Sequence, residues 1–291
     1  MAWLELTIGL QAQDPEPVET CLEGLGALAV TLTDAGDQPL LEPGVGETPL
    51  WQDVTLTALF ETDADQTGID TALRHVTSAE LSWHALEDRQ WEREWLTRFK
   101  PQQFGARLWI IPGDGPAIDN TAVNIRLDPG LAFGTGDHQT TAMCLRWLGD
   151  CDRLSGQQVL DFGCGSGILA IAALCLGADH ALGVDIDPQA LTATRDNAER
   201  NDVLDRLEIG MPDALTDQSF DLVIANILAA PLMELAPKIS AHVAPGGTLL
   251  LSGILREQAD AVMAAYTPII AFGPVQTDGD WVRLDGKRVA H

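Results

Sequence analysis

Residues 159–167 read Val-Leu-Asp-Phe-Gly-Cys-Gly-Ser-Gly, and the apolar run Ile168 to Leu174 follows at once. This order predicts a short strand, a glycine loop and a helix. Glycines at alternate positions let the backbone approach a ligand closely and adopt positive φ values without a clash at Cβ. A loop of this kind that opens into a helix N-terminus is how α/β proteins bind nucleotide-like cofactors.

The spacing of the glycines at 163, 165 and 167 indicates which cofactor is bound. A dinucleotide fingerprint needs G-x-G-x-x-G, whereas Ile168 directly follows Gly167 here. Asp161 precedes the loop, and the resulting D-x-G-x-G-x-G pattern resembles the first motif of S-adenosylmethionine-dependent methyltransferases. The simpler alternative is a tight strand-to-helix turn without a ligand, and the acidic residues downstream of the loop argue against it.

Length and composition set the class of protein. The chain has 291 residues, 46% of them hydrophobic, which suits one large domain or two ordinary ones. No apolar run approaches the roughly 18–20 residues of a membrane span, and the N-terminus lacks signal-peptide features, so we expect no membrane association and a cytoplasmic location. The five cysteines form no C-x-x-C pair, so we expect no disulfide framework and no metal site.

The chain is strongly acidic, with 17 basic and 43 acidic residues and a net charge of −26. Direct nucleic-acid binding is not expected, because phosphate contacts need clustered Lys and Arg. A basic macromolecular substrate would be attracted at low salt. An acidic surface that serves only solubility explains the same charge. Composition therefore favours a positively charged partner without requiring that a partner exists.

Residues 1–86 form a first predicted domain. Alternating or apolar runs predict strands over 3–10, 28–32, 54–60 and 81–86, with helices over 15–25 and 64–76. The order β-α-β-β-α-β is that of a ferredoxin-like α+β domain. This segment holds no cluster of catalytic residue types, so we expect a recognition module. An inert stabilising domain is the alternative.

A helical linker is predicted over residues 87–100. Its aromatic residues Trp91, Trp95 and Phe99 recur every fourth position and share one helix face, and Pro101 ends the helix. We expect this stripe to pack on the following domain rather than to bind a ligand.

Residues 101–291 are expected to form a doubly wound, Rossmann-like α/β domain, with ligands at the carboxyl ends of its strands. Its middle strands are near-continuous apolar runs, which is typical of parallel strands covered on both faces. The predicted strands are 107–111, 122–127, 158–161, 181–185, 206–209, 221–225, 247–251, 268–272 and 281–285. The predicted helices are 138–149, 167–176, 188–200, 231–242 and 256–266.

Two polar residues follow later strands of this domain. Asp185 stands about 20 residues past the glycine loop, where an acid can bind ribose hydroxyls. Asp187 precedes Pro188 and reads as the cap of the next helix. Asn226 closes an apolar strand, where its carbonyl could accept hydrogen bonds from a reacting amine; a turn-forming or capping role is the alternative.

A glycine-rich loop lies upstream, between residues 127 and 141. Glycines at 130, 134 and 136 surround Phe133 and predict a loop able to close over a cofactor. Thr141 and the first turn of the following helix could bind polar cofactor groups. His138 has no identifiable partner acid, so a capping role is as reasonable as that of a general base.

These residues identify the chain as a member of the ribosomal protein L11 methyltransferases. The most specific matches are Leu-Asp-Pro-Gly-Leu-Ala-Phe-Gly-Thr-Gly (127–136), His138 with Thr140-Thr141, and Asp-Phe-Gly-Cys-Gly-Ser-Gly-Ile-Leu-Ala-Ile-Ala-Ala (161–173). Further matches are Asp-Ile-Asp-Pro-Gln-Ala (185–190), Asp-Asn-Ala-Glu-Arg-Asn (196–201), Ala-Asn-Ile-Leu (225–228), Leu-Ser-Gly-Ile-Leu (251–255) and the linker Trp-Glu-Arg-Glu-Trp (91–95). The resemblance covers nearly the whole chain. It implies that the first domain recognises the ribosomal protein. It also implies S-adenosylmethionine contacts from Thr141, Gly163, Asp185 and Asn226, to which we add Phe133, Gly134, Thr135, Gly165 and Gly167.

The resemblance further implies methylation of amines, namely the N-terminal α-amine and lysine ε-amines, up to trimethylation. A lysine amine with a pKa of about 10.4 must first lose a proton, which a low-dielectric site favours. Asn226 is our candidate for orienting the amine, helped by the Ile227 carbonyl, and we expect no dedicated general base. Many amino-methyltransferases carry Asn-Pro-Pro-Tyr here, whereas this chain has Asn-Ile-Leu, so what packs against the amine stays open.

Other functions fit parts of the pattern. A nicotinamide-dependent oxidoreductase shares the fold but needs the missing glycine spacing. A non-catalytic protein for cofactor binding or ribosome assembly would bind the same molecules without forming product. A nucleic-acid methyltransferase conflicts with the charge. We expect a monomer.

Overall fold

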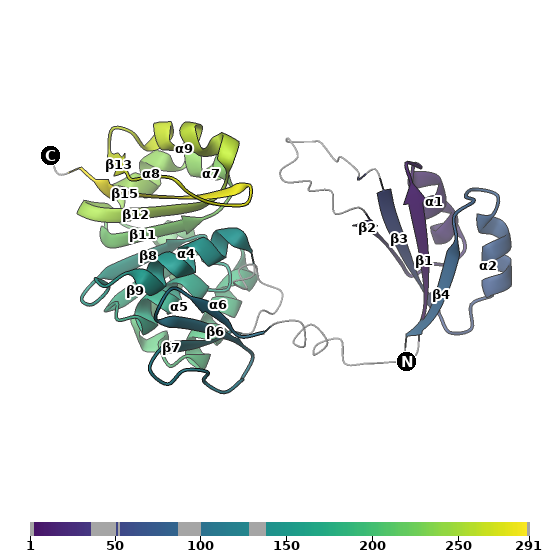
Figure 1. The fold of residues 1–291 in the computed structure, drawn as a ribbon, viewed down its shortest axis with the longest axis horizontal. Helices are drawn as coiled ribbons and strands as arrows, with labels where there is room; N and C mark the ends of the chain where they lie inside the picture. Colours follow the sequence, from purple (N-terminus) through teal and green to yellow (C-terminus); the bar gives the residue numbers. More distant parts are fainter. Residues whose placement is uncertain (1–2, 36–50, 52, 87–99, 128–137, 290–291) are drawn as a thin grey trace. The chain divides into compact units, whose positions relative to one another are not determined.

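The computed structural model describes residues 3–35, 51, 53–86, 100–127 and 138–289. The chain divides into two compact units, Met1–Glu94 and Trp95–His291 (Figure 1). Each unit has its own hydrophobic core and is described separately below.

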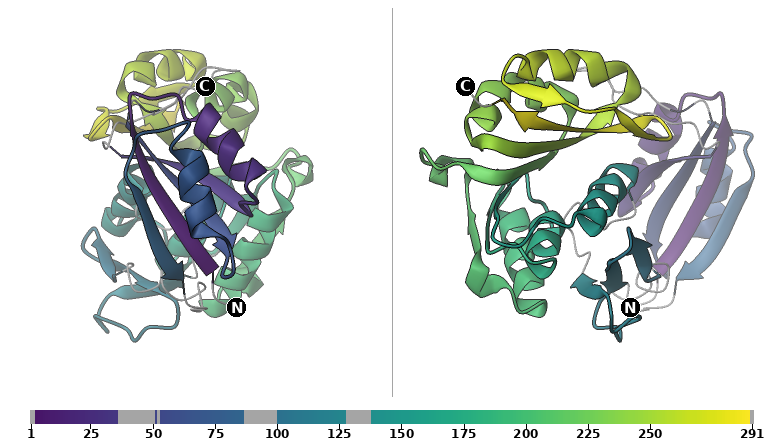
Figure 2. Two further views of the ribbon diagram at one scale, coloured as in Figure 1. Left: turned by 90° about the vertical axis from the view of Figure 1, so that its right-hand side faces the viewer. Right: turned by 60° about the vertical axis from the view of Figure 1, so that its left-hand side comes forward.

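The first unit is a four-stranded antiparallel sheet with two helices. The strands are β1 (Trp3–Gln11), β2 (Ala29–Asp34), β3 (Asp53–Glu61) and β4 (Leu81–Leu86), in the order β2-β3-β1-β4. The helices α1 (Glu16–Gly24) and α2 (Gln66–Leu73) cover the same face of the sheet (Figure 2). Along the chain the elements therefore run β-α-β-β-α-β.

The core of this unit lies between the sheet and the two helices. Every second residue of β1, from Leu4 to Leu10, is buried, because successive strand side chains point to opposite faces. The second helix is capped by Asp65, which accepts the Gly68 N–H at 3.1 Å. Its other end is joined to the sheet by the Trp83 indole, which donates to Asp70 at 2.9 Å.

The main sheet of the second unit is mixed and has eight strands. These are β8 (Gln158–Phe162), β9 (His180–Val184), β10 (Leu207–Gly210), β11 (Phe220–Asn226), β12 (Val243–Leu255), β13 (Ile270–Phe272), β14 (Gln276–Asp278) and β15 (Trp281–Arg288). Their order is β10-β9-β8-β11-β12-β15-β13, with β14 paired to β15. Strands β8 to β12 are parallel, and β15 runs antiparallel to β12.

Helices cover both faces of this sheet (Figure 2). On one face lie α4 (Gln139–Asp150), α5 (Ile168–Cys175) and α6 (Pro188–Arg200). On the other face lie α7 (Ala229–Glu234), α8 (Ala236–Ala241) and α9 (Ala259–Tyr266). Val159 and Leu160 are both fully buried, one under each helix layer, which explains why the central strands are apolar throughout. The doubly wound α/β prediction is confirmed.

The strand order reverses beside β8. From β8 the chain adds β9 and β10 on one side, and then returns to place β11 and β12 on the other. In open α/β sheets a ligand binds at the carboxyl ends of the strands that flank such a switch point. Here those ends are followed by the glycine loop after β8 and by Ile227 after β11.

The structure differs from the sequence-based expectation in two places. The strands predicted near 107–111 and 122–127 exist as β6 (Leu108–Pro112) and β7 (Val123–Leu127), but with β5 (Gln102–Phe104) they form a separate three-stranded sheet. It packs on α4, α5 and α6. The helix predicted over 231–242 is broken into α7 and α8, because Pro237 cannot donate a backbone hydrogen bond one turn back.

Separate cores predict separate unfolding. Leu6→Ala, at a fully buried position of β1, should destabilise the first unit by about 2–5 kcal/mol. Hydrogen exchange measured by mass spectrometry should then accelerate in peptides from β1–β4 and stay unchanged in β8–β12. The matched variant Leu160→Ala, in the core of the second unit, should give the opposite pattern. Equal acceleration in both units would contradict independent cores.

Candidate functional site

The candidate site lies at the edge of the main sheet where β8, β9 and β11 end. The three segments predicted to carry the chemistry are found there: the glycine loop at 163–167, Asp185 after β9 and Asn226 at the end of β11. The N-terminal turn of α4 joins them, because Asn226 is hydrogen-bonded to Thr141 of that helix.

All three glycines of the loop are in the left-handed region, with φ of 79° at Gly163, 56° at Gly165 and 77° at Gly167. A Cβ at Gly163 would overlap Cγ2 of Ile227, and a Cβ at Gly167 would lie 2.7 Å from Cγ2 of Thr194. Conformation and space both exclude a side chain at these two positions. No side chain therefore covers the loop backbone at these positions, where it passes from β8 into α5.

Neighbouring elements hold the loop through its backbone. The Val184 carbonyl at the end of β9 accepts the N–H groups of Gly163 and Cys164 at 2.8 and 3.0 Å. From α6, the Thr194 hydroxyl donates to the Gly165 carbonyl at 2.9 Å, and the Asn197 amide donates to the Ser166 carbonyl at 3.0 Å. The loop conformation is thus set before any ligand binds.

Asp185 also holds this loop. One carboxylate oxygen accepts the Gly165 N–H at 2.9 Å and the other accepts the Asp187 N–H at 3.0 Å. Each carboxylate oxygen has two lone-pair directions, so Asp185 keeps capacity for ligand hydroxyls. Asp187 caps α6 by accepting the Gln189 N–H at 2.8 Å, as its position before Pro188 predicts.

Asp161 lies beneath the loop with only 1% of its surface exposed. Its Oδ2 accepts the Ala170 N–H of α5 at 3.0 Å, whereas Oδ1 has no hydrogen-bond partner among the described residues. Burial, supported by the nearby Asp185 charge and opposed by the Ala170 hydrogen bond, raises the pKa of Asp161 to about 7. The sequence predicted Asp161 as part of the glycine motif but not as a site residue; its place directly before the glycines was the available signal.

Asn226 and Thr141 form the second half of the site. The Asn226 amide donates to the Thr141 hydroxyl at 3.1 Å, across 85 positions of sequence. Thr141 is buried, whereas Asn226 is partly exposed. This bond uses one amide N–H of Asn226 and leaves Oδ1, the acceptor that the predicted role requires, outside the bond to Thr141.

His138 caps helix α4. Its Nδ1 lies 2.8 Å from the Thr140 hydroxyl and 3.4 Å from the Thr140 backbone N, and its ring packs edge-on against Trp281 at 4.9 Å between centroids. The capping alternative is therefore the observed one. Cys164 is also structural: burial raises the pKa of its thiol far above the usual value, so it stays protonated.

Sequence reasoning missed three apolar residues at this edge. Ile186 follows β9 and is 78% exposed, Met211 follows β10 and is 40% exposed, and Leu228 is 55% exposed two residues after β11. Large apolar side chains just past the ends of parallel strands were the available signal. Exposed apolar surface beside convergent polar groups is typical of a ligand site.

Some predictions lie outside the described residues, namely Phe133, Gly134 and Thr135 of the upstream loop and the aromatic stripe Trp91, Trp95 and Phe99. Within the described ranges no group of three potential metal ligands occurs. No helix in the described part of the chain is long and apolar enough to cross a membrane.

A profile of the ribosomal protein L11 methyltransferase (PrmA) family matches residues 2–289. The chain belongs to this family. It is 50% identical over 293 residues to the ribosomal protein L11 methyltransferase of Hahella chejuensis, covering 100% of both chains. It is 51% identical over 292 residues to that of Pseudomonas putida strain W619, covering 99% of this chain and 100% of the relative.

A solved structure gives the same assignment. The ribosomal protein L11 methylase of Lactobacillus delbrueckii subsp. bulgaricus is 33% identical, with a TM-score of 0.60, and the match covers 66% of this chain and 100% of that one. Because the family profile spans both units, the first unit belongs to the family architecture and is not an addition to this chain.

The buried Asp161 predicts a pH-dependent stability. Between about pH 4 and pH 7 the folded chain holds a proton on Asp161 that the unfolded chain has lost, so the free energy of unfolding should fall as pH rises. Asp161→Asn removes this titration. Its free energy of unfolding relative to wild type should therefore rise by as much as about 4 kcal/mol across that window and level off above it.

Urea denaturation of both proteins from pH 5 to 8.5 measures this difference. Asp179→Asn is a suitable control, because Asp179 is exposed at the other end of β9. A difference between Asp161→Asn and wild type that does not change with pH would contradict the assignment.

Proposed function

We propose that this chain is an S-adenosylmethionine-dependent methyltransferase that acts on ribosomal protein L11. We further propose that it methylates amines, the N-terminal α-amine and lysine ε-amines, up to the trimethyl state. The observation that carries the proposal is the placement of the glycine loop and Asp185 beside the Asn226–Thr141 pair at one sheet edge.

The residues present fit an adenosine-containing cofactor. Gly163, Gly165 and Gly167 leave bare backbone at the N-terminus of α5, which carries partial positive charge and suits the cofactor carboxylate. Asp185 has free lone pairs for two ribose hydroxyls. The adjacent Ile186 offers an apolar surface to the flat base. Phe133, Gly134 and Thr135 are proposed contacts on the family resemblance alone.

Bound S-adenosylmethionine supplies a methyl group that its sulfonium makes electrophilic. The protein's task is to present a neutral amine in line with the C–S bond. Asn226 Oδ1 is oriented for this by the bond from its own amide to Thr141, and the Ile227 carbonyl is the second proposed acceptor. In the first transfer the two acceptors fix both N–H groups of the primary amine and so direct its lone pair at the methyl carbon; the monomethyl amine keeps one such N–H and the dimethyl amine none.

No general base is proposed. His138 is occupied as the cap of α4 and in contact with Trp281, so it is not placed to take protons from the amine. The amine loses its proton to water before each transfer, and the low dielectric of the site favours the neutral form.

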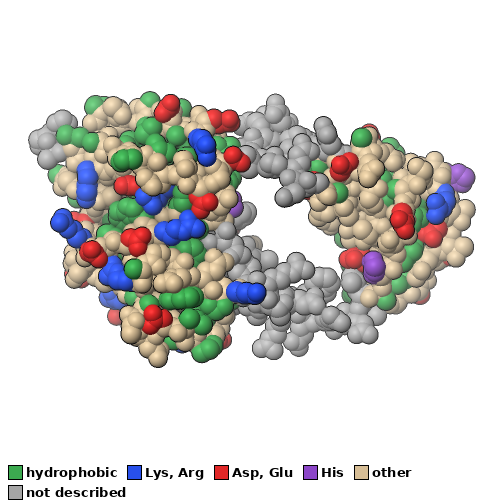
Figure 3. All heavy atoms as spheres, in the orientation of Figure 1, with side chains coloured by type: hydrophobic (Ala, Val, Ile, Leu, Met, Phe, Trp, Pro, Cys, Tyr) green, Lys and Arg blue, Asp and Glu red, His purple; other side chains and the backbone are tan. Residues whose placement is uncertain are grey.

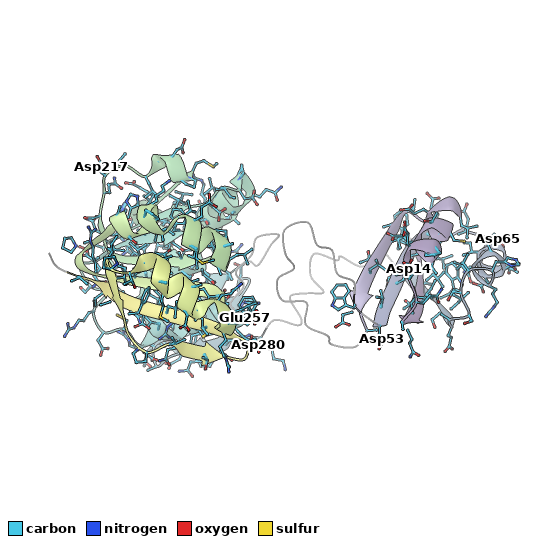
Figure 4. The ribbon with its side chains drawn as sticks, turned by 90° about the horizontal axis from the view of Figure 1, so that it is seen from above. Asp14, Asp53, Asp65, Asp217, Glu257 and Asp280 are labelled. Carbon is cyan, nitrogen blue, oxygen red and sulfur yellow. The ribbon has the colours of Figure 1, made fainter. Side chains whose placement is uncertain are left out.

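The first unit, over residues 1–86, is proposed to be a ferredoxin-like module that recognises the protein substrate. It holds fifteen acidic residues and one basic residue, Arg74. Asp14, Asp53 and Asp65 are exposed at separate places on this unit (Figure 4). The second unit, in contrast, carries many Lys and Arg side chains on the face shown in Figure 3. The negative electrostatic field of residues 1–86 attracts a basic polypeptide and repels nucleic acid.

Intact-mass spectrometry of L11 incubated with this protein and S-adenosylmethionine tests the proposal. Wild type should add mass in methyl steps. Asn226→Ala should slow the addition by about 100-fold even at saturating cofactor, because one oriented acceptor is lost; calorimetry measures how much of its implied cofactor contact is lost as well. Asp185→Ala should weaken cofactor binding itself, since it removes both the proposed ribose contact and the Gly165 hydrogen bond.

Asp179→Ala is the matched control for Asp185→Ala: it removes the same charge at the opposite end of β9 and should behave as wild type. Cofactor binding by wild type without any methyl addition would instead indicate a non-catalytic role. Hydride transfer to a nicotinamide, followed by absorbance, or methyl addition to RNA alone would refute the proposal.

A further inference from the structure

Ile227 lies between Gly253 of β12 and Gly163, the first residue after β8. Asn226 pairs with Ser252 of β12, and Ile224 pairs with Asp161 of β8. This register brings Gly253 to one side of Ile227 and Gly163 to the other. A Cβ at Gly253 would overlap the Ile227 carbonyl oxygen and lie 2.8 Å from its carbonyl carbon, whereas a Cβ at Gly163 would overlap only the Ile227 side chain.

Gly253 makes this contact because β12 is irregular there. The pairing of β12 with β15 shifts register between Leu251 and Ile254, and Gly253 has a φ of 81°. The buried Ser252 hydroxyl donates to the Val282 carbonyl of β15 at 3.1 Å, which holds the irregularity on that side. Irregular strand segments of this kind change the direction of nearby side chains and peptide groups, and they are frequent next to functional sites.

The two proposed amine acceptors therefore depend on different parts of the fold. The Asn226 side chain is oriented from α4 through Thr141. The peptide of Ile227 is in contact with β12 through Gly253. A displacement of about 1 Å at one acceptor would tilt the amine away from the in-line direction, which can lower a rate by about 100-fold.

We propose that Gly253 is a positioning residue for methyl transfer, which sets the Ile227 peptide and thereby the carbonyl that accepts from the target amine. This inference rests on the proposed function, in which that carbonyl is the second acceptor. It assigns Gly253 no contact with cofactor or substrate. Its effect is on kcat and not on cofactor affinity, because the atoms that a Cβ at Gly253 would meet belong to the Ile227 peptide and to none of the proposed cofactor contacts.

Gly246 provides a matched control in the same strand. It also has a positive φ, of 75°, but a Cβ there would meet nothing within 4 Å. Gly246→Ala thus introduces the backbone strain of a left-handed alanine without the contact. Both Gly253→Ala and Gly246→Ala should lower the unfolding temperature, whereas only Gly253→Ala should lower kcat, by about 100-fold with cofactor affinity unchanged.

A double-mutant cycle separates side-chain from backbone contact. Gly163→Ala should also lower kcat. In a protein that already carries Ile227→Ala, the same change should lower kcat much less, because the atom that clashes is then absent. Gly253→Ala should show no such reduction of its effect, since the peptide atoms it meets remain. If Gly253→Ala does not fold, Ser252→Ala decides, because it frees the irregular segment beside Gly253 from Val282: unchanged kcat together with unchanged Ile227 amide signals overturns the proposal.

The test is made on the full chain, with L11 and S-adenosylmethionine for kinetics. Wild-type kcat in Gly253→Ala, or an equal loss in Gly246→Ala, overturns the proposal. The backbone amide NMR signals of Ile227 and Leu228 give a readout that needs no substrate: they should shift in Gly253→Ala and not in Gly246→Ala. If wild type adds no methyl groups, the proposed function fails, whereas the amide signals still decide whether Gly253 positions the Ile227 peptide.

Discussion

The left-handed backbone of the loop between β8 and α5 is the constraint on which the rest of the site depends. Gly163 and Gly167 face Ile227 and Thr194 so closely that no side chain fits at either position. The backbone there must find its hydrogen bonds elsewhere, and it finds them in β9 and α6. The loop is consequently as rigid as the elements around it, although it is made of the most flexible residue type.

Several residues of the site have a structural role in addition to their proposed role in binding or orientation. Asp185 holds the Gly165 N–H and keeps lone pairs for a ligand, so one carboxylate serves both loop conformation and the proposed binding. Thr141 lies in the first turn of α4, which covers the sheet, and it also orients Asn226. Asp161 tolerates deep burial because part of its carboxyl caps α5, and burial in turn shifts its titration toward neutral pH.

The acidity of the chain is unevenly distributed. Residues 1–86 contain a single basic residue, whereas the second unit carries cations that are mostly engaged locally, such as Arg146 with Asp278 and Arg283 with Asp285. Paired cations contribute little long-range field, while unpaired surface carboxylates do. The proposed recognition of a basic polypeptide by the first unit rests on this difference.

Local signals predicted well where one element decides the outcome. The apolar strands, the glycine spacing, Asp187 before Pro188 and the positions of Asp185 and Asn226 at strand ends were all readable, because each depends on periodicity or on a single residue's conformational preference. The break between α7 and α8 was missed although Pro237 was visible, since the apolar pattern continued through it. The assignment of β6 and β7 to a separate sheet had no local signal.

By itself the sequence determined the doubly wound fold and the family, because hydrophobic periodicity and the spacing of glycines and acids are properties of the chain order. Tertiary structure alone decided which atoms meet: that Asp185 bonds Gly165, that Asn226 reaches Thr141 across 85 residues, and that Gly253 touches the Ile227 peptide. The physical reason is register. Which residue of one strand faces which residue of the next depends on close packing between distant segments, and no local pattern encodes it.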